Sequence, residues 1–242
     1  TMDNIEQLFQ WIKASNNIVF FGGAGVSTES GIPDFRSQDG LYNQHYAYPP
    51  EKILSHSFFI SHTEEFYRFY RDKMLFPKAM PNSAHIALAK LEKMGKLKSI
   101  ITQNIDGLHQ KAGSQKVFEL HGSVLRNTCT QCGKKYGIEK ILHSFGIPKC
   151  DCGGIIKPDV VLYEESLDED TINDALCDIR NAEVLIIGGT SLVVYPAAGF
   201  IQYYDSNQLV LINKSKTNVD NQANLVLHES IGKVLSEVVE RL

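Results

Sequence analysis

Short apolar runs alternate with longer amphipathic segments along the chain. The runs carry mainly β-branched, leucine and aromatic residues, and they lie at 18–21, 99–102, 117–120, 160–162, 184–187, 209–212 and 225–227. Strands that are apolar on both faces are typical of a parallel sheet buried between helices. The pattern therefore predicts an α/β fold, with a Rossmann-like parallel sheet and helices on both of its faces.

Three of the amphipathic segments keep apolar residues at helical spacing. They are 5–12, which follows a possible N-cap at Asp3, 172–179, which follows a possible N-cap at Asp168, and the C-terminal stripe 231–242. A capping side chain directly before an apolar stripe is a helix start signal. We expect helices at all three places.

Two stretches interrupt this rhythm. Residues 35–81 are rich in aromatic residues, His and Pro with a helical signal, and residues 123–156 hold paired cysteines with glycines. We interpret both as insertions that pack together into a smaller lobe formed by 35–81 and 123–156. The Rossmann-like domain would then comprise 1–34, 82–122 and 157–242.

Composition and charge exclude several classes of protein. Of the 242 residues 43% are apolar and 21% charged, as in ordinary globular proteins, and the net charge is −4. Such a chain has no basic field for a nucleic-acid backbone or an anionic membrane, so neither partner is expected. The longest uncharged stretch, 184–204, contains glycines and a proline that suit a strand, a turn and a helix better than a membrane span.

The cysteines indicate the cellular compartment of the protein. Four of the five lie in two close pairs between 129 and 152, and the N-terminal residues lack the pattern of a secretion signal. Closely paired thiols in a reducing compartment usually bind metal. We therefore expect a cytoplasmic protein.

A glycine-rich loop follows the first apolar run. It reads GGAGVST at 22–28 and leads towards a predicted helix, a setting that lets backbone N–H groups and a helix start approach a pyrophosphate. No acidic residue closes a second strand about twenty residues later, as a dehydrogenase would require. The loop alone is equally compatible with a tight packing turn.

Polar residues follow several other runs at the expected carboxyl edge of the sheet. Asn213 and the pair Thr190 and Ser191 end two of them, where they could contact ribose hydroxyls or act only as turn and cap residues. The polar residues of 102–109, TQNIDGLH, could likewise only stabilise a turn, or they could bind an amide and a sugar of a ligand. His121 follows the next run and could serve as a general base, although a lone histidine is more often a core residue.

The paired cysteines have the spacing of a zinc ribbon. The pairs lie in CTQCG at 129–133 and CDCGG at 150–154, and seventeen residues separate Cys132 from Cys150. Two pairs of thiolates complete a tetrahedral site, so one structural zinc ion held by Cys129, Cys132, Cys150 and Cys152 is expected, with no open position for catalysis. The single residue inside the second pair makes that turn tighter than usual.

These motifs, taken in order, closely resemble those of the sirtuins, NAD-dependent protein-lysine deacylases. The resemblance rests on GAGVSTESGIPDFR at 23–36, TQNIDGLH at 102–109, HG at 121–122, the four cysteines, PDVVLY at 158–163 and GTSLVVYPAA at 189–198. It covers nearly the whole chain, and the compact length is similar to that of bacterial members.

The resemblance implies a role for each matching residue. Ala24, Thr28, Phe35 and Arg36 would line the NAD pocket, Gln103 would contact the ribose next to nicotinamide, and Ile105 and Asp106 would hold the carboxamide. Thr190, Ser191 and Asn213 would bind the adenosine side, and Ile231, or else Ser230, would touch adenine. Val160, Val161, Leu162 and Tyr163 would pair as a strand with an extended acyl-lysine peptide.

The implied reaction consumes NAD as a co-substrate. His121 would take a proton from a ribose hydroxyl, and the products would be deacylated lysine, nicotinamide and 2′-O-acetyl-ADP-ribose. A mono-ADP-ribosyltransferase and a non-catalytic NAD-sensing or zinc-ribbon module remain as alternatives. Members that remove acidic acyl groups carry Tyr and, three residues later, Arg. Here Tyr67 is followed by Tyr70, so neutral acyl groups, acetyl first, are expected over succinyl.

Overall fold

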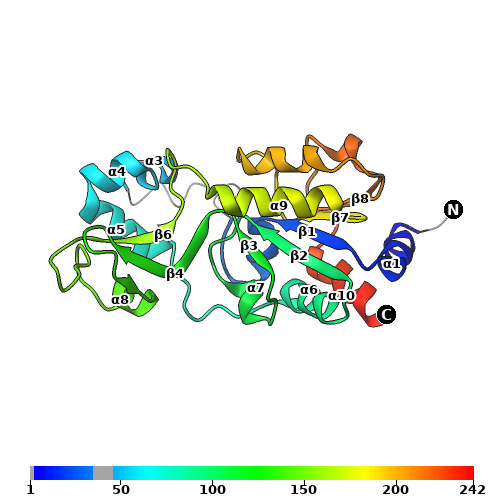
Figure 1. Cartoon of the computed structure of the whole chain (residues 1–242), viewed down its shortest axis with the longest axis horizontal. Helices are drawn as coiled ribbons and strands as arrows, with labels where there is room; N and C mark the ends of the chain where they lie inside the picture. Colours follow the sequence, from blue (N-terminus) through cyan, green and yellow to red (C-terminus); the bar gives the residue numbers. More distant parts are fainter. Residues whose placement is uncertain (1–2, 35–45) are drawn as a thin grey trace.

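The computed structural model describes residues 3–34 and 46–242, which form a larger and a smaller lobe (Figure 1). The larger lobe contains a six-stranded parallel sheet in the order β3-β2-β1-β7-β8-β9. Its strands are β1 (Ile18–Gly22), β2 (Leu97–Thr102), β3 (Val117–Glu119), β7 (Val184–Gly188), β8 (Leu209–Ile212) and β9 (Leu225–Leu227). This confirms the predicted parallel sheet and gives it the strand order of dinucleotide-binding folds.

Alternate side chains of the central strands serve two separate cores. Ile18, Phe20 and Ile186 belong to the core on one face, which is covered by α1 (Asn4–Ala14), α6 (Ser83–Lys93) and α10 (Ile231–Arg241). Val19, Phe21 and Leu185 belong to the core on the other face, under α9 (Glu169–Asn181) and the 3₁₀ segment η3 (Ala197–Tyr203). Figure 1 shows α9 on one side of the strands and α6 with α10 on the other.

The predicted helix caps are present. The side chain of Asp3 accepts a hydrogen bond from the N–H of Ile5, and Asp168 accepts one from Thr171. These bonds satisfy N–H groups that the first turn of a helix leaves without a partner. The three expected amphipathic helices are α1, α9 and α10.

The smaller lobe combines both interrupting stretches of the sequence. An antiparallel sheet in the order β5-β4-β6 is formed by β4 (Gly122–Cys129), β5 (Lys135–Tyr136) and β6 (Ile156–Val160). It packs with α3 (Pro50–Ile53), α4 (His56–Ser61), α5 (Thr63–Lys73) and α8 (Ile138–Leu142). One apolar core joins aromatic side chains of α4 and α5 to residues of β4, α8 and β6.

Two expectations about local structure were wrong. The run 160–162 is not a strand of the parallel sheet, because Val160 ends β6 in the smaller antiparallel sheet. The glycine loop leads into two 3₁₀ turns, η1 (Ala24–Val26) and η2 (Thr28–Ser30), and not into an α-helix. Gly31, at φ +88°, and the following Ile32-Pro33 pair end the turn there.

Within the described ranges, no helix has both the length and the apolar character needed to cross a membrane.

Candidate functional site

A cavity of about 700 Å³ lies at the carboxyl edge of the parallel sheet. Both lobes contribute to its lining. Ala24 comes from the loop after β1, Gln103 to Asp106 follow β2, His121 follows β3 and Gly189 to Ser191 follow β7. Val160 ends β6, and residues 161–163 follow it. The chain order reverses between β1 and β7, and a crevice at such a switch point is the usual ligand site of an open α/β sheet.

The loops after β1 and β7 approach each other closely because glycines face one another there. The N–H of Gly25 donates to the carbonyl of Gly189 at 2.7 Å. A Cβ atom added to Gly25 would lie 2.7 Å from the Cα of Gly189, which is closer than such atoms can come. Side chains here would push the two loops apart and widen the crevice.

Gln103 and Thr190 meet across this crevice. The hydroxyl of Thr190 donates to Oε1 of Gln103 at 2.9 Å. The two residues follow different strands, and the resemblance assigned Gln103 to the ribose next to nicotinamide and Thr190 to the adenosine side of the same dinucleotide. The structure brings them together on the cavity wall.

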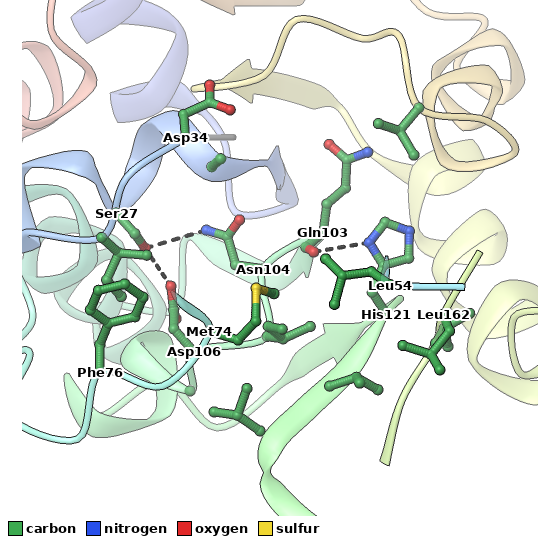
Figure 2. A pocket seen from close by; sticks show the side chains of 18 of the residues that line it. Ser27, Asp34, Leu54, Met74, Phe76, Gln103, Asn104, Asp106, His121 and Leu162 are labelled. Atoms are coloured by element: carbon green, nitrogen blue, oxygen red, sulfur yellow. Dashed lines mark hydrogen bonds between the residues drawn. The ribbon is translucent and has the colours of Figure 1, made fainter. Parts of the chain in front are cut away.

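Asp106 is held in place on both of its carboxylate oxygens, and Figure 2 shows the bond to Ser27. Oδ1 accepts from the N–H of Leu108 at 2.9 Å, and Oδ2 accepts from the hydroxyl of Ser27 at 2.6 Å. Each oxygen keeps a second lone pair, so the carboxylate can still accept a hydrogen bond from a ligand amide.

A buried histidine fixes the direction of the bonds around Ser27. Nδ1 of His85 accepts from the backbone N–H of Asn82 at 3.0 Å, so the proton of the neutral ring resides on Nε2. Nε2 lies 3.3 Å from the hydroxyl of Ser27 and donates to it, and Ser27 donates in turn to Asp106. Burial lowers the pKa of His85, which keeps the ring neutral despite the nearby Asp106 carboxylate.

Sequence reasoning missed Ser27 and His85 as site residues and included Asn104 only as part of the polar run 102–109. The side-chain amide of Asn104 donates to the carbonyl of Gly23 at 2.9 Å and to the hydroxyl of Ser27 at 3.3 Å. These residues are far apart in sequence, and only the fold joins them. The available signal was the polar Ser27 inside an otherwise apolar and glycine-rich loop.

His121 presents one ring nitrogen with a defined role. Its Nδ1 lies 3.0 Å from the backbone carbonyl of Gln103, so Nδ1 carries the proton and donates. Nε2 is left with its lone pair, and the residue lines the cavity (Figure 2). Burial lowers the pKa of His121, although the bond to Gln103 acts in the opposite direction. The site therefore contains a neutral imidazole that can accept a proton near pH 7.

The segment 160–163 runs along the cavity and is bound to the protein along one edge. The N–H of Val161 donates to the carbonyl of His121 at 2.8 Å, and the N–H of Tyr163 donates to the carbonyl of Leu54 at 2.9 Å. The N–H of Leu162 donates to the Glu165 carboxylate at 2.9 Å. This extended segment is thus fixed between the loop of His121 and the smaller lobe.

The remaining sequence-predicted residues lie elsewhere. Thr28, Asn213 and Ile231 are not among the lining residues; Thr28 donates to Gly25, and Asn213 donates to Ser215. The side chain of Ile231 is 7% exposed and packs in the core against the sheet. Phe35 and Arg36 fall outside the described residues.

The four paired cysteines form a compact cluster in the smaller lobe. Their Sγ atoms all lie within 4.8 Å of one another, and the Cys129–Cys152 and Cys132–Cys150 pairs are both 3.5 Å apart. A zinc–sulfur distance of about 2.3 Å separates the sulfurs of a tetrahedral site by about 3.8 Å. Backbone N–H groups of Cys132 and Gly154 also point at the sulfurs. The cluster therefore fits one tetrahedral zinc ion.

Comparison with known proteins agrees with this geometry. The profile of the Sir2 family matches residues 23–196. The chain belongs to the Sir2 family. The match spans the glycine loop, the residues after β2 and β3, the cysteine cluster and the loop after β7, so it confirms the resemblance to sirtuins on the motifs that carried it.

Several relatives of this Sir2-family chain are close over their whole length. An NAD-dependent protein deacetylase of Clostridium perfringens is 62% identical over 98% of this chain and 99% of its own, and one of Clostridium tetani is 60% identical over 100% and 99%. Among solved structures, a Sir2 homologue in complex with NAD has a TM-score of 0.89 at 38% identity, covering 100% of this chain and 94% of its own. A Sir2 protein with a p53 peptide and NAD⁺ has a TM-score of 0.86 at 39% identity, covering 99% and 98%.

Proposed function

We propose that this Sir2-family protein is an NAD-dependent protein-lysine deacetylase. It transfers the acetyl group of an acetyl-lysine side chain to the ribose of NAD, consumes one water molecule from solvent, and yields deacetylated lysine, nicotinamide and 2′-O-acetyl-ADP-ribose. One arrangement carries the proposal: a neutral His121 with a free Nε2 and a positioned Asp106 carboxylate line the same cavity at the switch point of the sheet. The names of the close relatives point the same way.

The polar wall of the cavity suits NAD. Asp106, with a lone pair free on each oxygen, accepts from the carboxamide N–H of nicotinamide beside Ile105, and Gln103 contacts the adjacent ribose. Ala24, Thr190 and Ser191 form the part of the wall nearest the glycine loops. Bound NAD supplies a sugar carbon with a good leaving group, onto which the acetyl oxygen is directed. Thr28, Asn213, Ile231, Phe35 and Arg36 are assigned to NAD by the resemblance to sirtuins alone, since the first three do not line the cavity and the last two fall outside the described residues.

His121 acts as the general base. Its Nε2 accepts a proton from a ribose hydroxyl, while Nδ1 stays bonded to Gln103 and holds the ring in orientation. A base that is fixed in one tautomer and is neutral at pH 7 contributes about 10²–10⁴-fold to such a step.

The acetyl-lysine protein binds as an extended peptide beside 160–163. One edge of this segment is already bonded to His121 and Leu54, so the opposite edge receives the peptide by strand addition. A peptide carbonyl replaces the Glu165 carboxylate at the N–H of Leu162. Cys129, Cys132, Cys150 and Cys152 hold a structural zinc ion that keeps this lobe in shape.

The test is incubation with NAD and an acetyl-lysine peptide, followed by mass spectrometry of all products. We expect free nicotinamide, deacetylated peptide and an acetyl-ADP-ribose in solution. The variant His121→Ala should lose at least about 10²-fold in kcat while still binding NAD. His143→Ala, which removes an exposed histidine of the smaller lobe, is the matched control and should keep full activity.

Other products would support other functions. ADP-ribose attached to a protein acceptor would indicate a mono-ADP-ribosyltransferase that uses the same cavity. The absence of nicotinamide release with any acyl peptide would indicate a binding module. Full activity in His121→Ala would remove the assigned base.

A further inference from the structure

The cavity has one polar and one apolar wall. The polar wall comes from the sheet edge, with residues such as Gln103, Asn104 and Asp106. The apolar wall comes from the core of the smaller lobe and is formed by Leu54, Tyr70, Met74, Val124, Ile138, Val160 and Leu162. Figure 2 shows Leu54 and Leu162 beside His121, and Met74 between them and Asp106. An apolar acyl chain that reaches His121 must therefore extend along the wall of the smaller lobe.

Tyr70 is the largest side chain on this apolar wall, and it is locked in position. It is 0% exposed, its ring stacks on Phe66 with centroids 5.5 Å apart and planes at 14°, and it meets Tyr67 edge-on at 6.0 Å. Close-packed aromatic rings cannot move aside without breaking these contacts or shifting the core around them. The ring of Tyr70 is thus a fixed boundary of the cavity.

The hydroxyl of Tyr70 gives this boundary a second property. Its oxygen is buried and has no hydrogen-bond partner among the described residues. Burial raises the pKa of Tyr70 well above its usual range, so the group is an uncharged phenol. The boundary therefore carries no charge, and its effect on a longer chain comes from the bulk of the ring.

The arginines nearest to Tyr70 in the sequence do not serve the cavity. The guanidinium of Arg71 donates to the carbonyl of Ile141 and lies over the ring of Tyr67, and that of Arg68 lies over the ring of Tyr46. Neither residue is among the lining residues. These two arginines therefore offer no positive charge to an acyl carboxylate, and the lysine of α5 that lines the cavity is Lys73.

We propose that Tyr70 closes the acyl channel and sets the acyl specificity of the enzyme. The proposal rests on the proposed deacetylase function. The enzyme accepts acetyl and other short neutral acyl groups and rejects medium and long chains, because the ring of Tyr70 occupies the space that their further methylene groups need.

The test compares acetyl-, butyryl- and octanoyl-lysine in one peptide sequence. For the wild type, kcat/KM should be at least about tenfold lower for the octanoyl peptide than for the acetyl peptide. One methylene group that does not fit a tight pocket already lowers kcat/KM by about this factor. Tyr70→Ala should raise the octanoyl-to-acetyl ratio by at least about tenfold. Tyr70→Leu, which retains part of the bulk, serves if the alanine variant does not fold.

Two controls separate the ring from general packing. Tyr70→Phe keeps the ring and should keep the wild-type ratio. Phe69→Ala removes a fully buried ring of the same helix that does not line the cavity, so it should lower stability without changing the ratio. An unchanged ratio in active Tyr70→Ala, a wild type that prefers octanoyl, or a Phe variant that behaves like the alanine variant would overturn the proposal.

Failure of the proposed function would look different. In that case the wild type would release no nicotinamide with any of the three peptides. Calorimetric binding of the same peptides still tests the channel, because Tyr70 should make the octanoyl peptide bind at least about tenfold more weakly than the acetyl peptide. Equal binding of the two peptides would exclude a closed channel.

Discussion

Two influences act on the imidazole of His121, and together they leave it neutral with Nε2 free to accept a proton. Burial favours the neutral ring, and the carbonyl of Gln103 accepts the proton of Nδ1 and so leaves Nε2 free. A histidine in water would lose half of its basic form at a pH of about 6.5. In this site the basic form persists to lower pH.

The pH dependence of turnover should report this shift. We expect the acidic limb of kcat/KM for the acetyl peptide to lie below pH ~6.5, the ordinary histidine value. The measurement is a pH profile at constant ionic strength, with NAD saturation checked at each pH. An acidic limb at or above that value would mean that the ring of His121 is not desolvated in the working enzyme.

His109 contributes to stability and not to the cavity. It is 2% exposed, neither ring nitrogen has a partner among the described residues, and it packs against His85 at 4.9 Å. Burial, with a smaller effect of His85, lowers its pKa to about 3. As pH falls below about 6.5 the unfolded chain therefore binds a proton that the folded chain does not.

This difference predicts a loss of stability in acid. His109 alone should lower the free energy of unfolding by about 2 kcal/mol between pH ~6.5 and pH ~5. His109→Phe keeps a ring beside Phe20 and His85. Its free energy of unfolding, measured with urea at both pH values, should fall by about 2 kcal/mol less than that of the wild type. His143→Gln, at an exposed position, is the control. Equal pH dependence in wild type and His109→Phe would contradict the assignment.

At the scale of elements, the sequence was sufficient to predict a helix or strand wherever a local pattern of residues determines that element by itself. Caps such as Asp3 and Asp168 and the apolar runs at β1, β7 and β8 are local signals, and the structure confirms them. The run at 160–162 failed because an apolar run does not specify which sheet it joins. The bond between Ser27 and His85 could not be predicted, since it depends on how α6 packs beside the glycine loop.

The turn from β3 into β4 determines where His121 points. Gly122 directly follows His121, has φ +77°, and faces β6 so closely that an added Cβ would lie 1.9 Å from the carbonyl oxygen of Asp159. Only glycine combines this conformation with this contact. The pairing of β4 with β6 and the orientation of the base thus depend on one residue.

Gly122→Ala should damage both stability and activity. We expect a loss of roughly 3 kcal/mol or more in the free energy of unfolding, from a backbone clash added to left-handed strain, and a fall in kcat. Gly95→Ala is a close control, because Gly95 has the same φ of +77° but nothing within 4 Å of an added Cβ. It should cost only about 1–2 kcal/mol and keep full activity. Equal effects of the two substitutions would show that the contact with β6 does not matter.

At the scale of the whole molecule, the cavity exists because two lobes with separate cores face each other. The polar wall belongs mainly to the sheet edge, whereas the apolar wall belongs to the smaller lobe. That lobe is small, and Cys129 and Cys150 are part of its core. Small hydrophobic cores usually need a disulfide or a metal ion for stability, and the four cysteine sulfurs are placed to bind such an ion.

Removal of metal should therefore affect one lobe selectively. We expect about one zinc ion per chain, and chelation should abolish deacetylation and the hydrogen-exchange protection of β4, β6 and α8, while β1, β7 and β8 stay protected. Cys177→Ser, which changes the one cysteine outside the cluster, should bind zinc and react as the wild type does. The apolar wall and the segment 160–163 are part of the lobe that the zinc ion would stabilise. A metal-free protein with full activity would therefore contradict this prediction and would show that the aromatic core of α4 and α5 maintains the cavity without metal.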